Sequence, residues 1–143
     1  MHIFDQIVRC EQGWSMFRNA CYKLSLEDKD WNGAERACNQ VGAHLTSVHS
    51  QEESDFIRCL QDPASVHTTW IGGKRNGDIF QWIDGTPFEF KYWKTNEPDN
   101  YGGDENCIEI ISDPGKQWHE KWNDVPCEST AKFVCQKQPV GGE

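Results

Sequence analysis

Oxygen-bearing side chains of the kind that bind hard metal ions gather in two segments of the chain. One segment contains Glu97, Asp99 and Glu105, and the other contains Asn123 and Asp124. A calcium ion takes roughly six to eight such oxygens in a flexible geometry that suits a loop, whereas magnesium requires a stricter octahedron. None of the five residues is a histidine or a cysteine, which disfavours zinc and copper. If the two segments meet, these residues predict a calcium site.

Two cysteines bracket these segments. Cys107 follows the first acidic segment and Cys127 follows the second, so a bond between them would hold both segments at one place. The chain from Tyr92 to Asn106 has little hydrophobic periodicity and is rich in proline, glycine, asparagine and acids. Loops of this length in compact domains are usually functional, or else disordered. The alternative to a calcium site is therefore a solvated acidic loop that binds nothing.

The cysteine content indicates the cellular compartment. The chain has seven cysteines: Cys10, Cys21, Cys38, Cys59, Cys107, Cys127 and Cys135. No Cys-x-x-Cys pair and no His-Glu-x-x-His motif occurs, which disfavours a thioredoxin motif or a zinc site. Three disulfides and one unpaired cysteine in a secreted or extracellular protein are the better interpretation, against unrelated thiols in a cytosolic one. Spacing alone does not choose among the pairings.

The composition fits one domain and excludes two classes of partner. The 143 residues include 14 Lys and Arg against 23 Asp and Glu, a formal net charge of −9. A nucleic-acid-binding protein needs a basic face, and so does a protein that binds anionic lipid by charge. An acidic chain instead favours a cation as ligand. No apolar run approaches the ~20 residues of a membrane span.

Two segments have helical periodicity. Trp31, Ala34, Cys38 and Val41 recur on one face of a helix that Gly42 ends. A second helix begins with a capping box, Ser50 followed by Glu53, and ends before Pro63. Its inward face consists of Phe56, Ile57 and Leu60.

One strand pattern lies between these helices and the others come after them. The expected strands are residues 44–48, 70–72, 80–82, 107–111 and 133–135, with a turn at Asn76 and Gly77 between the second and the third. Helices followed by short strands predict an α+β fold with an antiparallel sheet.

An ordered set of motifs along the chain resembles the C-type lectin-like domain. The set is Cys10…Gly13-Trp14…Cys21-Tyr22, Trp31-x-x-Ala34…Cys38, Gly42-Ala43-His44-Leu45, Glu52/Glu53, Trp70-Ile71-Gly72, Glu97-Pro98-Asp99, Trp122-Asn123-Asp124, Cys127 and Phe133-Val134-Cys135. The resemblance covers residues 10–137, with residues 1–9 as an N-terminal extension and residues 138–143 as a flexible tail. It implies two helices and two small antiparallel sheets with a long calcium-binding loop region. It also implies three disulfides, namely Cys10–Cys21, Cys38–Cys135 and Cys107–Cys127.

The resemblance also implies a function and assigns roles to residues. Sugar-binding members of this family are not enzymes; in them a calcium ion joins the protein to two vicinal hydroxyls of a terminal hexose. Carried over by motif, the calcium ligands are Glu97, Asp99, Glu105, Asn123 and Asp124, the last also through its backbone carbonyl. The same five residues would hydrogen-bond the sugar. Pro98 would follow a cis peptide bond, and Tyr101 would stack on the apolar face of a galactose.

The central motif departs from both common patterns. Members with Glu-Pro-Asn resemble mannose binders and members with Gln-Pro-Asp resemble galactose binders, but this chain has Glu97-Pro98-Asp99. A carboxylate accepts hydrogen bonds and donates none, so Asn123 is the one donor in the ligand set. We expect tight calcium binding with weak or unusual sugar binding. Whether the glycan partner contains mannose or galactose stays open.

Several alternatives remain at this point. The adjacent acids Asp104 and Glu105 could form the carboxylate pair of a glycosidase, although loop acids more often bind metal or water. A domain of the same fold could instead bind a protein, a glycolipid or ice. The family suggests recognition of microbial or host surface sugars, in innate immunity or cell adhesion.

Two further expectations concern single positions. A second family calcium site would need acids between Gly73 and Ile79, where Lys74 and Arg75 stand. Cys59 lies outside the three implied bridges and would be buried, free or the link of a homodimer.

Overall fold

The structure is a computed structural model that describes residues 8–61, 67–117 and 121–141. Both expected helices are present: α1 spans Trp31–Gln40 and α2 spans Gln51–Cys59. Each begins with a side-chain cap, because Asp30 accepts a hydrogen bond from the N–H of Gly33 and Ser50 accepts one from the N–H of Glu53.

Two expectations concerned the ends of the helices. Val41 was expected inside but is 48% exposed, because α1 ends at Gln40 and the chain turns away through Gly42 with φ of 74°. The expected end of the second helix at Pro63 lies outside the described residues.

The strands form one mixed sheet. They are β1 Ser15–Phe17, β2 Ala20–Lys29, β3 His44–Leu45, β4 His67–Asn76, β5 Ile79–Trp82, β6 Cys107–Ser112, β7 Trp122–Val125 and β8 Ala131–Lys137. The sheet order is β1-β2-β8-β4-β6-β7, with β3 on β8 and β5 on β4. The α+β class is confirmed. The two antiparallel sheets that we expected are joined by a parallel pairing of β4 with β8, at Thr69↔Lys132 and Trp70↔Phe133.

Three details of the expected strands were wrong. Strands β1 and β2 come before the first helix, and β2 shows no simple alternation because Cys21 and Tyr22 are both buried. Strand β3 covers two residues rather than the five from 44 to 48. Strand β7 was not expected, because asparagine and aspartate are poor strand formers; pairing with β6 overrides that preference.

Tryptophan side chains and disulfides hold the core together. Trp31, Trp70 and Trp122 are fully buried, and the indole N–H of Trp31 donates to the carbonyl of Ile71 at 2.9 Å. Gly72 leaves room for this packing, since a Cβ there would lie 2.5 Å from the backbone oxygen of Leu45. All three expected disulfides are present: Cys10–Cys21, Cys38–Cys135 and Cys107–Cys127.

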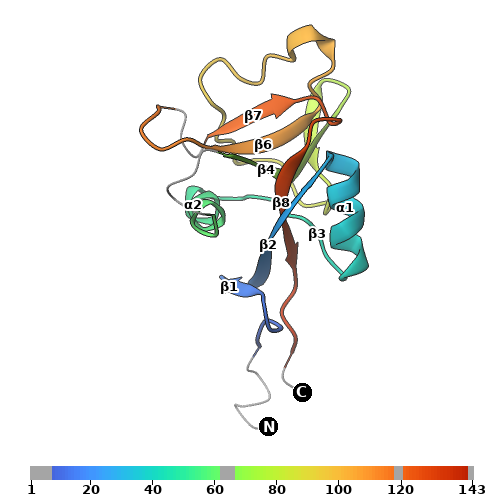
Figure 1. Cartoon of the computed structure of the whole chain (residues 1–143), viewed down its shortest axis with the longest axis vertical. Coiled ribbons are helices and arrows are strands. Elements are labelled where there is room, and N and C mark those ends of the chain that lie inside the picture. Colours follow the sequence, from blue (N-terminus) through green and yellow to red (C-terminus); the bar gives the residue numbers. More distant parts are fainter. Residues whose placement is uncertain (1–7, 62–66, 118–120, 142–143) are drawn as a thin grey trace.

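The acidic loop and the chain ends lie at opposite ends of the molecule. Figure 1 shows the loop before β6 at the top, with α1 and α2 on either side of β2 and β8. Near the two ends of the described chain, Arg9 and Val140 exchange backbone hydrogen bonds of 3.1 and 2.7 Å. Within the described part of the chain, no helix has the length and apolar content to span a bilayer.

A candidate calcium site

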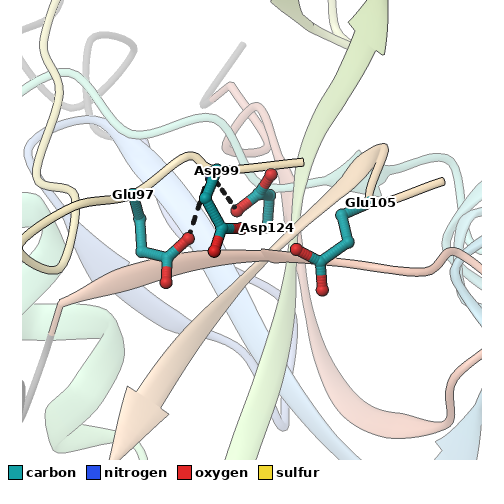
Figure 2. Close-up of side chains that lie close together, drawn as sticks. All are labelled: Glu97, Asp99, Glu105 and Asp124. Carbon is teal, nitrogen blue, oxygen red and sulfur yellow. Dashed lines mark hydrogen bonds between the residues drawn. The ribbon is translucent and has the colours of Figure 1, made fainter. Parts of the chain in front are cut away.

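Four acids from the two predicted segments converge in space. Glu97, Asp99, Glu105 and Asp124 each offer a carboxylate oxygen, and these oxygens all lie within 4.8 Å of one another. Figure 2 shows the carboxyl groups of Glu97 and Glu105 turned toward Asp99 and Asp124, which lie between them. A compact set of carboxylate oxygens is the donor chemistry that calcium binds.

Neighbouring strands bring the two acidic segments together. Asp124 lies in β7 opposite Ile108 of β6, and Glu105 lies two residues before β6 begins. The Cys107–Cys127 disulfide joins the start of β6 to the chain just after β7. The start of the loop is held as well, because the N–H of Lys94 donates to the carbonyl of Trp122 at 2.8 Å.

Backbone N–H groups of the loop point at these carboxylates. The N–H of Asp99 donates to Glu97 Oε1 at 3.1 Å and to Asp124 Oδ1 at 3.3 Å. The N–H of Tyr101 donates to Glu105 Oε1 at 2.9 Å and to Asp99 Oδ1 at 3.2 Å. The peptide bond between Glu97 and Pro98 is cis, as expected. These hydrogen bonds shape the loop around the acidic cluster, so the four carboxylates share one space.

The cluster has strongly perturbed electrostatics. Burial, reinforced by the neighbouring Asp124 and Asp99, raises the pKa of Glu97 to about 7. Burial and the neighbouring Asp99 raise the pKa of Glu105 to about 7 as well. A hydrogen bond with Glu105 lowers the pKa of Asp99. Carboxylates this close repel one another, so some of them keep a proton when no cation is bound. A divalent cation would relieve the same repulsion and displace those protons.

The remaining predicted site residues lie beside this cluster. Asn123 directly precedes Asp124 in β7 and is half-buried, and its role as a fifth ligand stays a prediction. Tyr101 lies in the short 3-10 helix η2, Tyr101–Gly103, and is 70% exposed. Glu109 of β6 pairs with Asn123 on the neighbouring strand. Burial raises the pKa of Glu109 to about 7.

Two residues at the site were missed by sequence reasoning. Arg75 of β4 places its guanidinium 3.1 Å from Asp124 Oδ2. Asn100, in a left-handed conformation, accepts a hydrogen bond from the N–H of Glu105 at 3.0 Å. The Asn100 conformation had a sequence signal, since asparagine adopts positive φ more readily than most residues other than glycine. The Arg75 contact had none, because it joins residues 49 positions apart.

An aromatic groove adjoins the cluster. Its volume is about 680 Å³, and Phe80, Trp82, Phe88 and Trp93 contribute to its wall. Pro98, between two of the acids, also lines it.

Comparison with known proteins assigns the chain to a family. The family model for the lectin C-type domain matches residues 27–137. This chain belongs to the C-type lectin domain family. The C-type lectin lectoxin-Lio1 of Erythrolamprus poecilogyrus is 37% identical over 138 residues, which cover 93% of this chain and 83% of that protein. The versican core protein of Homo sapiens is 37% identical over 135 residues, or 91% of this chain, but the match spans 4% of versican.

Solved structures with the same fold include an antifreeze protein and a carbohydrate-recognition domain. A calcium-independent type II antifreeze protein superposes with a TM-score of 0.83 and 26% identity, over 94% of this chain and 98% of its own. The carbohydrate-recognition domain of cow CD23, solved in the presence of a GlcNAc2Man3 oligosaccharide, gives a TM-score of 0.81 and 30% identity. That superposition covers 92% of this chain and 98% of the CD23 domain. These superpositions show that the chain has the C-type lectin fold, and they do not identify its ligand.

Proposed function

We propose that this C-type lectin domain binds terminal hexoses in a calcium-dependent manner, with the recognition domain at residues 10–137. The observation that carries the proposal is the convergence of Glu97, Asp99, Glu105 and Asp124, with carboxylate oxygens within 4.8 Å of one another. Arg75 neutralises Asp124, but Glu97 and Glu105 each keep a pKa of about 7, as expected for carboxyl groups crowded at a functional site. The cow CD23 carbohydrate-recognition domain, solved in the presence of an oligosaccharide and 30% identical, supports a glycan as the ligand.

The proposed ligands for the ion are the four acids together with Asn123. Bound calcium would supply a positive charge to which two vicinal hydroxyl oxygens of a hexose can coordinate. Asp99 and Glu97 on either side of Pro98 accept hydrogen bonds from those hydroxyls, and Asn123 is the member of the set that can donate one. An acceptor left without a donor costs about 1–3 kcal/mol. The sugar affinity is therefore modest, for mannose-type and galactose-type glycans alike.

The second candidate is a C-type lectin-like module for another ligand, such as a protein, a glycolipid or ice. Two observations favour it. The antifreeze protein with a TM-score of 0.83 is described as calcium-independent. The Glu97-Pro98-Asp99 motif also lacks the amide that helps to satisfy a sugar hydroxyl. A calcium-independent ligand would leave the acidic cluster without a part in recognition.

Retention on immobilised sugars separates the two candidates. The chain is applied to mannose and galactose resins in calcium, and eluted with EDTA or with free sugar. We expect retention that both eluents reverse, loss of retention in Glu105→Gln, and full retention in Glu128→Gln, an exposed acid outside the cluster. Retention by neither resin, or elution by neither reagent, contradicts sugar binding through calcium. A glycan array with and without calcium then identifies the sugar.

We also propose that the domain is not an enzyme. Ser47, His49 and Asp84 do lie together, but the Ser47 hydroxyl is the central member: it donates to Asp84 at 2.5 Å and contacts His49 Nε2 at 3.1 Å. In a catalytic triad the histidine stands between the other two, so this order cannot activate the serine.

Two proposals concern the environment of the domain. Three disulfides support a secreted or extracellular location. Cys59 is exposed at the end of α2 and forms no disulfide among the described residues, which leaves it available as a homodimer link. Non-reducing electrophoresis of the wild type and Cys59→Ser tests that link.

A further inference from the structure

Arg75 connects strand β4 to both parts of the acidic cluster. Its guanidinium donates to Asp124 Oδ2 at 3.1 Å and to the backbone carbonyl of Glu105 at 3.2 Å. The backbone N–H of Arg75 donates to the carbonyl of Asn106 at 2.7 Å. The guanidinium also lies over the ring of Phe80, 4.4 Å from its centre, which fixes its plane. One residue therefore contacts the end of the loop, the strand that carries Asp124, and the core.

This ion pair is shielded from solvent. The side chain of Asp124 is 0% exposed and that of Arg75 is 16% exposed. A buried carboxylate without a partner is strongly unfavourable, so removal of one partner of such a pair is far more damaging than loss of a surface ion pair. A guanidinium stays charged at every pH that proteins tolerate, so the positive charge beside Asp124 does not depend on the supply of metal.

The contacts divide the oxygens of Asp124 between two tasks. Oδ2 already accepts from Arg75 and, at 2.9 Å, from the N–H of Asn100. Oδ1 accepts a longer contact of 3.3 Å from the N–H of Asp99. Oδ2 is thus committed to holding the loop against β4, while Oδ1 remains the less occupied oxygen on the side of Asp99.

We propose that Arg75 is an internal cation that keeps the acidic loop folded without calcium. The domain then binds one calcium ion in a site that is formed before the ion arrives. This inference rests on the proposed calcium site, and it makes Arg75 a positioning residue rather than a ligand of the ion or the sugar.

Hydrogen exchange in EDTA tests the inference without calcium or sugar. We expect residues 99–106 to be protected in the wild type and to exchange at least about ten-fold faster in Arg75→Gln, with the charge-preserving Arg75→Lys closer to the wild type. Added calcium should restore protection in Arg75→Gln. Lys74→Gln is the matched control, because Lys74 lies over the ring of Trp31 at 5.1 Å and is one residue away; its loop should exchange like the wild type. Equal exchange in the wild type and Arg75→Gln overturns the proposal.

Calcium stoichiometry provides a test that needs no variant. Calorimetric titration of the wild type should give one calcium ion per chain, and two ions would overturn the proposal even if Arg75→Gln fails to fold. The outcomes also separate this inference from the proposed function. A chain with a protected loop in EDTA that binds no sugar retains the role of Arg75 and loses only the lectin activity.

Discussion

The backbone N–H of Asp99 donates a hydrogen bond to the Glu97 carboxylate across Pro98, at 3.1 Å. The two acids on either side of the proline therefore share one space instead of pointing apart (Figure 2). A sugar that approached this pair would meet two acceptors and no donor, which is the chemical difference between this chain and either common family motif.

Replacing one of these acids by its amide should strengthen sugar binding. Asp99→Asn restores a donor in the mannose-type arrangement, and Glu97→Gln restores one in the galactose-type arrangement. Each should raise affinity for its own sugar by about 1 kcal/mol, or roughly five-fold. Titration with methyl α-mannoside and methyl β-galactoside in saturating calcium measures this. Asp104→Asn, at an exposed acid outside the cluster, is the control; unaltered binding in both test variants would remove the hydrogen-bond argument.

Calcium affinity should fall steeply as the pH drops below 7. Glu97 and Glu105 each have a pKa of about 7 without metal, and both must lose their protons to bind calcium. We expect the calcium Kd to rise roughly ten- to a hundred-fold between pH 8 and pH 6, depending on whether one or two protons are displaced. Calorimetry at several pH values measures this Kd. A constant Kd between pH 8 and pH 6 would contradict the displacement of protons from Glu97 and Glu105 by calcium.

The same groups predict the pH dependence of stability in EDTA. Their pKa values of about 7 in the folded protein exceed the value of 4.5 for an ordinary glutamate. The folded state therefore binds more protons than the unfolded chain between pH 4.5 and 7, and the contribution of these groups to the free energy of unfolding falls as the pH rises through that window. Glu105→Gln should flatten this dependence, whereas Glu128→Gln should not.

The exposed ring of Tyr101 should matter for one class of sugar only. Tyr101 lies on the loop surface beside the acids, where its ring can stack on the apolar face of galactose. Tyr101→Ala should weaken galactose binding by about 1 kcal/mol, Tyr101→Phe should preserve it, and mannose binding should be the same in all three proteins. Equal losses for both sugars in Tyr101→Ala would indicate damage to the loop rather than a lost stacking contact.

Loss of the disulfide between Cys107 and Cys127 should lower both the stability of the fold and the affinity of the site for calcium. The disulfide closes a separation of 20 residues, for which chain entropy gives a stabilisation of about 3 kcal/mol. Because it joins the two segments that carry the acids, replacement of both cysteines by serine should weaken calcium binding by about ten-fold or more. The matching change at Cys10 and Cys21, at the other end of the molecule, should leave calcium affinity within about two-fold.

Much of the fold could be predicted because its signals are local. The capping box at Ser50 marks the start of α2, and Gly42 lies two residues after the end of α1. The positions that failed depend on distant partners. Val41 has the right spacing for a buried face, but the helix ends before it. Strand β7, with Asn123 and Asp124, exists because β6 pairs with it, and no local pattern indicates that.

The sequence allowed the acids of the site to be named, but not their positions and contacts in space. Their residue types and the bracketing cysteines selected Glu97 and Asp124, and the structure brings four of the five proposed ligands together. Arg75 could not be found in this way, because at the sequence level it counted only as an absent acid. Its effect on the site depends on a contact between β4 and β7, strands separated by β6 in the sheet order.

The pairing of Arg9 with Val140 has a practical consequence. It places the first and last described segments of the chain side by side, at the far end from the acidic loop (Figure 1). A tag, bead or sensor surface joined at either of these segments would leave the acidic loop accessible. Several copies fixed by these segments to one support would present their loops in the same direction, which is the geometry that favours multivalent capture of a glycan-covered surface.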